Sequence, residues 1–479
     1  MPNRPIRREK LYINGEWIKA SEYSNLLSPY DQELLAEIPL ASVTEVTKAI
    51  EAAHGSREIL RKMPAHERGA ILERIANLIE EKFEVAAKII ALEAAKPIKT
   101  ARLEVQRTIQ TYKFAAEEAK RIHGETIPID AAPGGENKIA FTIREPIGVV
   151  AAITPFNFPM NLVAHKVGPA IAVGNPVVLK PASQTPLSSF FLAQICEHAG
   201  LPNGGLNIVT GKGSTVGDVL VKSDLVKKIT FTGSPAVGRS IRDKAGLKKV
   251  TLELGSNSAV ILDKNVPLDK IIPRCVMGAF SYQGQVCISL QRIYVHEEVY
   301  EKFVDLFITE TKKLKIGNPL NEDTDLSALI SPDEITRVQA LIHESVEQGA
   351  TVALGGDNED TILKPTILLN VPNTSRVSCQ EVFAPVVVIN KIASMEEAYR
   401  LVNESEFGLQ AGIYTESIHT ALNAAEQLHV GGVIINDIPT FRVDHMPYGG
   451  VKNSGMGREG VKYAIEEMTE MKLVVFNRD

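Results

Sequence analysis

The chain has 479 residues and a formal net charge of −6, which is enough length for two or three domains. Its 44% hydrophobic content predicts a large core, and the lack of a basic run argues against nucleic acid as a partner. No apolar run approaches the roughly 20 residues that cross a bilayer, so we expect no membrane association. The four scattered cysteines lack metal-ligand spacing. They are typical of reduced thiols in a cytoplasmic protein without a metal site.

The first predicted elements are helices. Between about residues 41 and 120, apolar residues recur at three- and four-residue spacing, and Pro97 ends a second helical run that begins at Arg68. Residues 121–146 read as two short extended segments around APGGEN, which is typical of a hairpin. The basic N-terminus has no apolar stretch behind it and does not fit a secretory signal.

Strands and helices alternate in the rest of the chain. From residue 147 to 256, buried strands such as GVVAAITP and NPVVLKP are separated by helical runs. These need crossover connections, and hence a parallel sheet covered on both faces. After Gly255 the alternation resumes with SAVILD, a helix over 267–283 and further strands up to about residue 440. The predicted fold class is α/β, with two doubly wound parallel-sheet domains and a small extra strand region.

Polar residues follow the strands of the first predicted sheet, where ligands of such sheets bind. Lys180 ends VVLK and could bind ribose hydroxyls or phosphate, although an ordinary surface lysine is favoured on this segment alone. Gly233 and Ser234 precede a predicted helix whose N-terminus could receive a pyrophosphate, and a tight strand–helix turn explains them equally well.

Three further residues suggest covalent chemistry. Glu253 lies among leucines in TLELGS, where burial favours a general base, and a salt-bridged structural glutamate is the alternative. Asn157 in TPFNFP could donate its amide to an oxyanion, or simply form a rigid turn. Cys287 in YQGQVC would face both from the second domain, although free cysteines are more often core residues. Together, a thiol, a base, an amide donor and a dinucleotide platform describe oxidation through a thioester.

The segments that carry these residues resemble the aldehyde dehydrogenase superfamily. EPIGVVAAITPFNFP, VVLKPASQTPLS, ITFTGSPAVG, TLELGSNSAVI, YQGQVC, EVFAPVV and PYGGVKNSGMGREG follow one another in the family's order. The resemblance implies that Cys287 is the nucleophile, that Glu253 is the general base, and that Asn157 and the Cys287 N–H hold the oxyanion. It also implies NAD(P)-dependent, non-acylating oxidation of an aldehyde to its acid by way of a cysteine thiohemiacetal and thioester.

The resemblance extends to the cofactor and to assembly. The residues that it implies for the cofactor are Thr154, Lys180, Ser183, Gly213, Gly233, Ser234, Glu381 and Phe383. Strictly NAD-dependent members usually have glutamate at position 183, so Ser183 favours acceptance of NADP because no carboxylate would repel a 2′-phosphate. The implied organisation is a dinucleotide-binding domain (1–120 and 147–256), a catalytic domain (257–440) and oligomerisation strands (121–146 and 460–479) of a homodimer or homotetramer. The effect of serine at position 256, where the family usually has glycine, stays open.

The substrate is the least determined part. Arg442 and His445, in the loop aligned with the family's substrate entrance, and Arg107, on a helix, could anchor an acidic aldehyde, or could make structural contacts only. Position 286 is valine, whereas we associate arginine there with family members that use phosphorylated triose substrates. Such a substrate is therefore disfavoured. We expect a small aliphatic aldehyde or semialdehyde, as in the succinic semialdehyde and lactaldehyde branch. Rival interpretations are a CoA-acylating enzyme, against which Glu253 argues, a cysteine hydrolase, and a retired homologue that acts as a binding protein.

Overall fold

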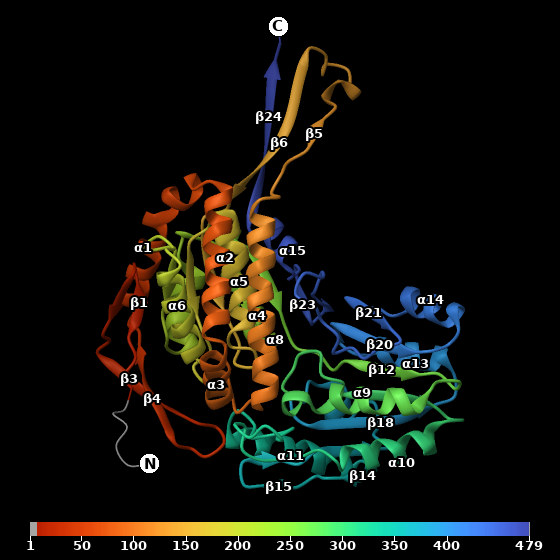
Figure 1. The fold of residues 1–479 in the computed structure, drawn as a ribbon. Coiled ribbons are helices and arrows are strands. Elements are labelled where there is room, and N and C mark those ends of the chain that lie inside the picture. Colours follow the sequence, from red (N-terminus) through yellow and green to blue (C-terminus); the bar gives the residue numbers. More distant parts are fainter. Residues whose placement is uncertain (1–6, 479) are drawn as a thin grey trace.

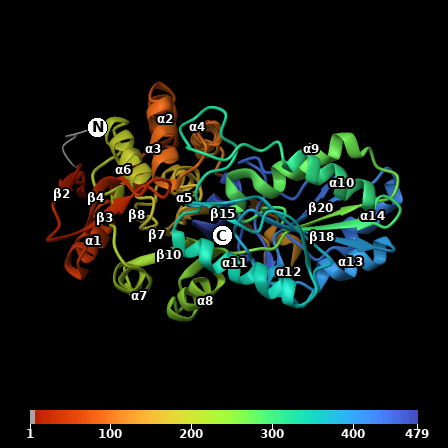
Figure 2. The ribbon, with the colours of Figure 1, turned by 90° about the horizontal axis from the view of Figure 1, so that it is seen from below.

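The structure is a computed structural model that describes residues 7–478; residues 1–6, the start of the basic N-terminal segment, and residue 479 lie outside it. Two lobes lie side by side, and a narrow arm of strands projects away from them (Figures 1 and 2). Among the described residues, no helix has the length and apolar character needed to cross a membrane.

The first lobe is built on an eight-stranded sheet with the order β2-β1-β9-β8-β7-β10-β11-β23. The five strands from β9 to β11 are parallel, as predicted, and antiparallel strands close both edges. The N-terminal strands were not predicted. The bounds are β1 (Leu11–Ile13), β2 (Glu16–Ile18), β7 (Val149–Ile153), β8 (Val177–Lys180), β9 (Leu206–Ile208), β10 (Val226–Thr232), β11 (Lys249–Glu253) and β23 (Gly455–Met456).

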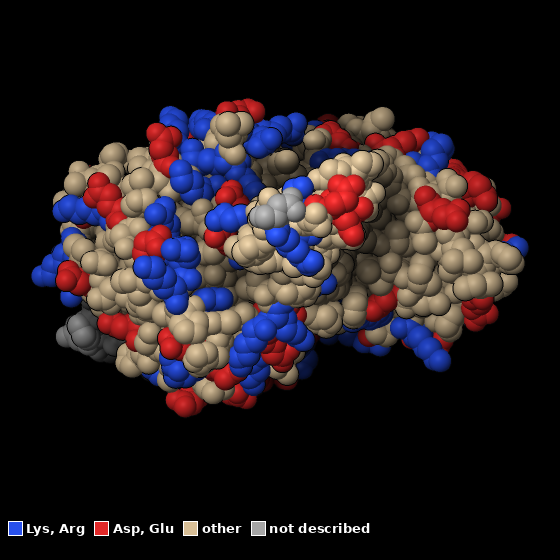
Figure 3. All heavy atoms as spheres, turned by 90° about the horizontal axis from the view of Figure 1, so that it is seen from above, with Lys and Arg blue, Asp and Glu red and all other residues tan. Residues whose placement is uncertain are grey.

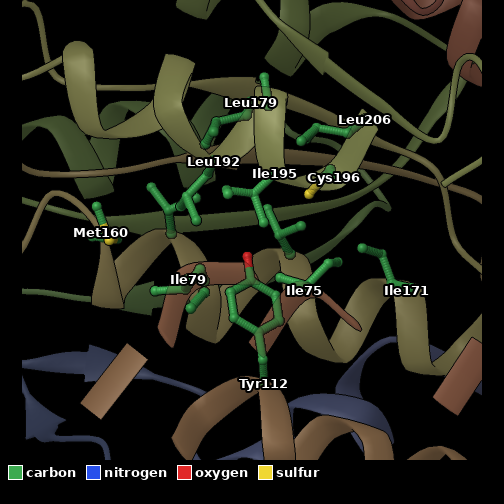
Figure 4. Packing of buried hydrophobic residues seen from close by; sticks show 14 of the residues in the cluster. Ile75, Ile79, Tyr112, Met160, Ile171, Leu179, Leu192, Ile195, Cys196 and Leu206 are labelled. Atoms are coloured by element: carbon green, nitrogen blue, oxygen red, sulfur yellow. The ribbon is translucent and has the colours of Figure 1, made fainter. Parts of the chain in front are cut away.

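Helices cover both faces of this sheet and form one hydrophobic cluster on each. Figure 4 shows part of one cluster, in which Tyr112 and Ile75 face Leu192 and Cys196. The helices are α1 (Val43–Lys62), α2 (Ala65–Glu81), α3 (Phe83–Ala94), α4 (Ile98–Ala119), α5 (Asn161–Val173), α6 (Leu187–His198), α7 (Asp218–Lys222) and α8 (Pro235–Lys244). The predicted single run from Arg68 breaks at Lys82, because α3 turns there to pack against α4 and α6.

The second lobe is built on a seven-stranded sheet with the order β14-β17-β18-β13-β12-β20-β21, parallel except for β14. Its strands are β12 (Ala259–Leu262), β13 (Arg292–His296), β14 (Thr351–Leu354), β17 (Thr366–Leu369), β18 (Val386–Ile392), β20 (Gln410–Tyr414) and β21 (Gly432–Ile435). Its helices are α9 (Leu268–Phe280), α10 (Tyr300–Thr311), α11 (Pro332–Glu347), α12 (Arg376–Cys379), α13 (Met395–Asn403) and α14 (Ile418–Gln427). This second doubly wound sheet matches the predicted fold class.

The arm is a three-stranded antiparallel sheet in which β6 (Lys138–Pro146) lies between β5 (Thr126–Ile127) and β24 (Thr469–Asn477) (Figure 1). The helix α15 (Val461–Glu467) leads into β24. Viewed toward the arm, Figure 3 shows acidic and basic side chains interspersed over the surface. The remaining strands are β3 (Glu22–Leu27), β4 (Leu34–Leu40), β15 (Asn358–Glu359), β16 (Ile362–Leu363), β19 (Phe407–Gly408) and β22 (Val451–Lys452).

Candidate active site

A cleft of about 940 Å³ lies between the two lobes. Asn157 and Glu253 line it from the first lobe, and Cys287 and Glu381 line it from the second. Two ends of the cleft are distinguished below. The thiol end contains Cys287, Glu253 and Asn157, and the α8 end contains Lys180, Gly213, Gly233 and Ser234. The carboxyl ends of the parallel strands β7, β8, β10 and β11 therefore do meet at one edge, and they face the cysteine.

A sharp turn carries Cys287 into the cleft. The predicted helix over 267–283 ends early at Phe280, because Tyr282 and Gln283 adopt left-handed backbone angles with φ of 49° and 55°. Gly284 follows with φ of 69°, and a Cβ there would lie 2.1 Å from the Ala384 carbonyl oxygen. The turn therefore needs glycine at position 284.

Cys287 is half-buried, and burial raises the pKa of its thiol to about 11. Its Sγ lies 2.8 Å from the hydroxyl of Tyr448. The guanidinium of Arg442 stacks on the Tyr448 ring, 3.7 Å from its centroid, and its charge acts to lower the pKa of the thiol. Cys196, by contrast, is fully buried in the core of Figure 4. Only one of these two thiols is placed to meet a ligand.

Asn157 is held from both sides. Its Nδ2 donates to the Gln285 carbonyl at 3.0 Å, and its own carbonyl accepts from Lys96 Nζ at 2.6 Å. Lys96 is fully buried in an ion pair with Glu104. Sequence reasoning missed this pair, because Lys96 lies in the connection between α3 and α4 and Glu104 is one of several charged residues of that region. The ion pair fixes the backbone that presents the Asn157 amide to the cleft.

Glu253 is 3% exposed at the end of β11. Among the described residues, neither of its carboxylate oxygens has a hydrogen-bond partner. Burial, with repulsion from Glu459 as a smaller cause, raises its pKa well above the ordinary value. A carboxyl group in this environment binds a proton more readily than one in water, which suits a group that takes a proton from a neighbour.

Glu459 is the charged counterpart of Glu253. It accepts from Lys166 Nζ at 2.9 Å and from Arg442 at 3.0 Å, and these cations hold the pKa of its carboxyl well below the ordinary value. This buried network was also missed, because its members come from positions 166, 442 and 459 and no local pattern joins them.

The structure places the three substrate candidates in contact with other side chains of the protein. Arg442 is 7% exposed at its side chain and paired with Glu459. Arg107 is half-buried in a salt bridge with Asp444, with 2.7 Å between Nη2 and Oδ1. His445 is exposed and packs on Phe114 with 4.9 Å between ring centroids. Within residues 7–478, none of the three is among the residues that line the cleft.

The α8 end collects most of the residues predicted to bind a dinucleotide. The residues that line it are Thr154, Lys180, Gly213, Gly233 and Ser234. Lys180 is buried, and its Nζ lies 3.3 Å from the Pro181 carbonyl; burial lowers its pKa. Ser234 caps α8, its hydroxyl accepting from the Val237 N–H at 3.5 Å, and Ser183 is exposed beside the lining residue Ala182.

Glu381 and Phe383 also line the cleft. Glu381 accepts from the Ser256 N–H at 2.9 Å, and burial raises its pKa to about 7. Phe383 packs edge-on against Phe156, with ring centroids 5.7 Å apart. The Ser256 hydroxyl lies 3.1 Å from that of Ser258.

Comparisons with known proteins agree with this geometry. The sequence model of the aldehyde dehydrogenase family matches residues 17–474. The chain is 48% identical over 472 residues to a 3-sulfolactaldehyde dehydrogenase of Priestia aryabhattai, covering 98% of each. It resembles aldehyde dehydrogenase 21 of Physcomitrella patens, solved with the reaction product succinate, with TM-score 0.97, 39% identity and 99% coverage of both chains.

A further solved structure is glyceraldehyde-3-phosphate dehydrogenase GapN of Methanocaldococcus jannaschii in complex with NADP. It has a TM-score of 0.92 and 43% identity, with 95% of this chain and 100% of that chain covered. The match spans both lobes, the cleft and the arm. The chain therefore belongs to the aldehyde dehydrogenase family.

Proposed function

We propose that the chain oxidises a small acidic aldehyde to the carboxylic acid with NAD(P), using Cys287 as nucleophile, Glu253 as general base and Asn157 as oxyanion donor. The observation that carries this proposal is the convergence of the three side chains in one cleft whose other end offers a cation and a capped helix N-terminus. Family membership supplies the reaction class, oxidation of an aldehyde with NAD(P).

The side chains divide the chemistry among them. The Cys287 thiolate attacks the aldehyde carbon, and the Asn157 amide with the Cys287 N–H stabilises the oxyanion that forms. NAD(P), which Lys180, Ser234 and Glu381 would hold, would supply the hydride acceptor needed to oxidise the adduct to a thioester. Glu253 then takes a proton from the water that attacks the thioester, which frees the acid and restores the thiol. Its buried site, which favours the neutral carboxyl, suits a group that must both take and return a proton.

The α8 end fits the phosphates and ribose of a dinucleotide. Lys180 is a buried cation whose nearest acceptor is a long 3.3 Å from its Nζ, and the N-terminus of α8 presents backbone N–H groups to anions. Glu381 would hold the nicotinamide ribose, and Phe383 would pack on the ring. Ser183 adds no negative charge, so NADP should be accepted; the GapN structure, which contains NADP, supports that expectation.

The substrate proposal rests on the cations around the thiol end. Arg442 lies against Tyr448, which contacts the nucleophile, and its Nε is buried without a partner in the described chain. An anionic group on a short aldehyde would satisfy that donor. The similar 3-sulfolactaldehyde dehydrogenase, and the similar structure solved with the reaction product succinate, fit the same chemistry. Arg107 is a more distant contributor.

We also propose that the arm joins copies of the chain into a homodimer or homotetramer in the cytoplasm. Its strand β24 exposes several apolar side chains, which is unfavourable in water unless they are covered. The exposed residues are Met471, Leu473, Val475 and Phe476.

The test is formation of reduced cofactor, followed by absorbance, with a panel of aldehydes and with NAD and NADP in parallel. Succinic semialdehyde, lactaldehyde, propanal and benzaldehyde cover acidic, hydroxylated, aliphatic and aromatic substrates. We expect the highest kcat/KM with an acidic aldehyde, and turnover with NADP at least equal to that with NAD. A preference for propanal or benzaldehyde would reject the role of Arg442, and turnover with NAD alone would reject the role of Ser183.

A further inference from the structure

We propose that the hydroxyl of Tyr448 is the donor that holds Cys287 Sγ and stabilises its thiolate, which makes Tyr448 a further catalytic residue. The inference deepens the proposed function, because it rests on Cys287 being the nucleophile. The contact that carries it is the 2.8 Å distance between the sulfur and the phenolic oxygen.

The direction of the hydrogen bond follows from which of the two atoms carries a proton. While Cys287 is a neutral thiol, either atom can donate. Once the sulfur loses its proton it can only accept, so the phenol becomes the donor and the bond becomes charge-assisted. Burial raises the pKa of Tyr448 well above its ordinary value, so the phenol keeps the proton that it must donate. The contact therefore favours the thiolate over the thiol.

The surroundings make the contact strong and fix its geometry. Tyr448 is 3% exposed and lies in an apolar cluster with Tyr282, Val286 and Leu409, where the low dielectric strengthens polar interactions. Its backbone N–H donates to the Glu459 carbonyl at 3.0 Å, and its carbonyl accepts from the Glu459 N–H at 2.7 Å. These two hydrogen bonds fix the backbone from which the phenol reaches the sulfur.

Other charges face the same sulfur from three elements. Arg442, from the loop before Tyr448, favours the thiolate, whereas Glu253 from β11 and Glu381 from the segment before β18 oppose it. Burial raises the pKa of Glu253 well above its ordinary value, and a raised pKa weakens this opposition. Among the described residues, Tyr448 is the group whose side chain forms a hydrogen bond with Sγ, whereas Arg442, Glu253 and Glu381 act on it only through their charges. Removal of the Tyr448 hydroxyl should therefore act directly on thiolate formation.

The experiment is alkylation of the enzyme by iodoacetamide, with the second-order rate measured across neutral and alkaline pH. Tyr448→Phe is compared with the wild type and with Tyr282→Phe, which removes a buried phenol in the same cluster that donates to the Ala94 carbonyl instead. Cys287→Ser identifies the rate that belongs to this thiol. We expect Tyr448→Phe to raise the kinetic pKa of Cys287 by about one unit, and to slow alkylation at neutral pH about tenfold.

Tyr282→Phe should keep the wild-type profile. An unchanged profile in Tyr448→Phe, or an equal shift in both tyrosine variants, would overturn the proposal. Thermal melting of each variant separates loss of the hydrogen bond from loss of the fold. Alkylation uses neither aldehyde nor cofactor, so its outcome is distinct from that of the proposed function: an enzyme that turns over normally while Tyr448→Phe alkylates like the wild type rejects the role of Tyr448 alone.

Discussion

Behind the thiol end of the cleft, buried charged side chains are paired with one another, whereas at the α8 end the residues are partly open and several donors have long or no contacts. Lys96 and Glu104 form an ion pair behind Asn157, and Glu459 receives two cations behind Glu253. At the α8 end, Lys180 Nζ lies 3.3 Å from a carbonyl, and Ser183 is exposed.

This difference separates two physical tasks. A reacting group has to be held in place before the substrate arrives, because reorganisation during the reaction adds to the barrier. A cofactor that binds and leaves needs donors that exchange water for phosphate without breaking an internal network. The variants below alter one end at a time.

The largest effect is expected from the nucleophile. Cys287→Ser should lower kcat by at least about 10³-fold, since it removes the thiolate while leaving the fold unchanged. Cys196→Ser is the matched control, because that thiol is fully buried in the core of Figure 4. It should lower the melting temperature and keep kcat per folded molecule. Equal loss of kcat in both variants would mean that Cys287 acts only by packing.

The next effect concerns the oxyanion donor. Asn157→Ala should lower kcat by about 10²–10³-fold with a small change in KM, because the lost donor acts mainly in the transition state. The measurement is steady-state kinetics with the best aldehyde of the panel. A matched change at Asn207, whose amide donates to Gly204 and Val177 carbonyls within the first lobe, should affect stability instead. A rise in KM alone for Asn157→Ala would contradict the assigned role.

The smallest effect is expected at the α8 end. Ser183→Glu should lower the ratio of kcat/KM for NADP to that for NAD by about 10-fold or more, because the new carboxylate repels a 2′-phosphate. Ser183→Gln is the neutral control of similar size. If both variants change the ratio equally, the cause is size and the charge argument fails.

Much of the α8 end and the strand-end residues could be predicted from the sequence. Buried apolar strands followed by polar residues identify a parallel sheet edge locally, so Asn157, Lys180, Ser234 and Glu253 were expected together, and the structure places them along one cleft. These residues meet because parallel order brings the carboxyl ends of the strands to the same edge of the sheet.

The buried ion pairs behind the thiol end could not be predicted in the same way. Lys166, Arg442 and Glu459 meet only through folding, and no spacing in the sequence joins them. The left-handed backbone at Tyr282 was hidden because the apolar pattern of α9 continues up to it. Tyr448 lies in the glycine-rich segment PYGGVKNSGMGREG, directly before two glycines. An aromatic ring that carries a hydroxyl at this position was the signal that could have identified it.

The proposed mechanism requires that Cys287 binds the substrate covalently and that Glu253 activates the water that hydrolyses the thioester. The most direct measurement is intact-mass and peptide mass spectrometry of Glu253→Gln after incubation with an acidic aldehyde and NADP. The account predicts a stoichiometric acyl adduct on the Cys287 peptide that persists, because the water lacks its base, and that disappears in wild-type enzyme. Absence of any adduct, or an adduct on another residue, would contradict it.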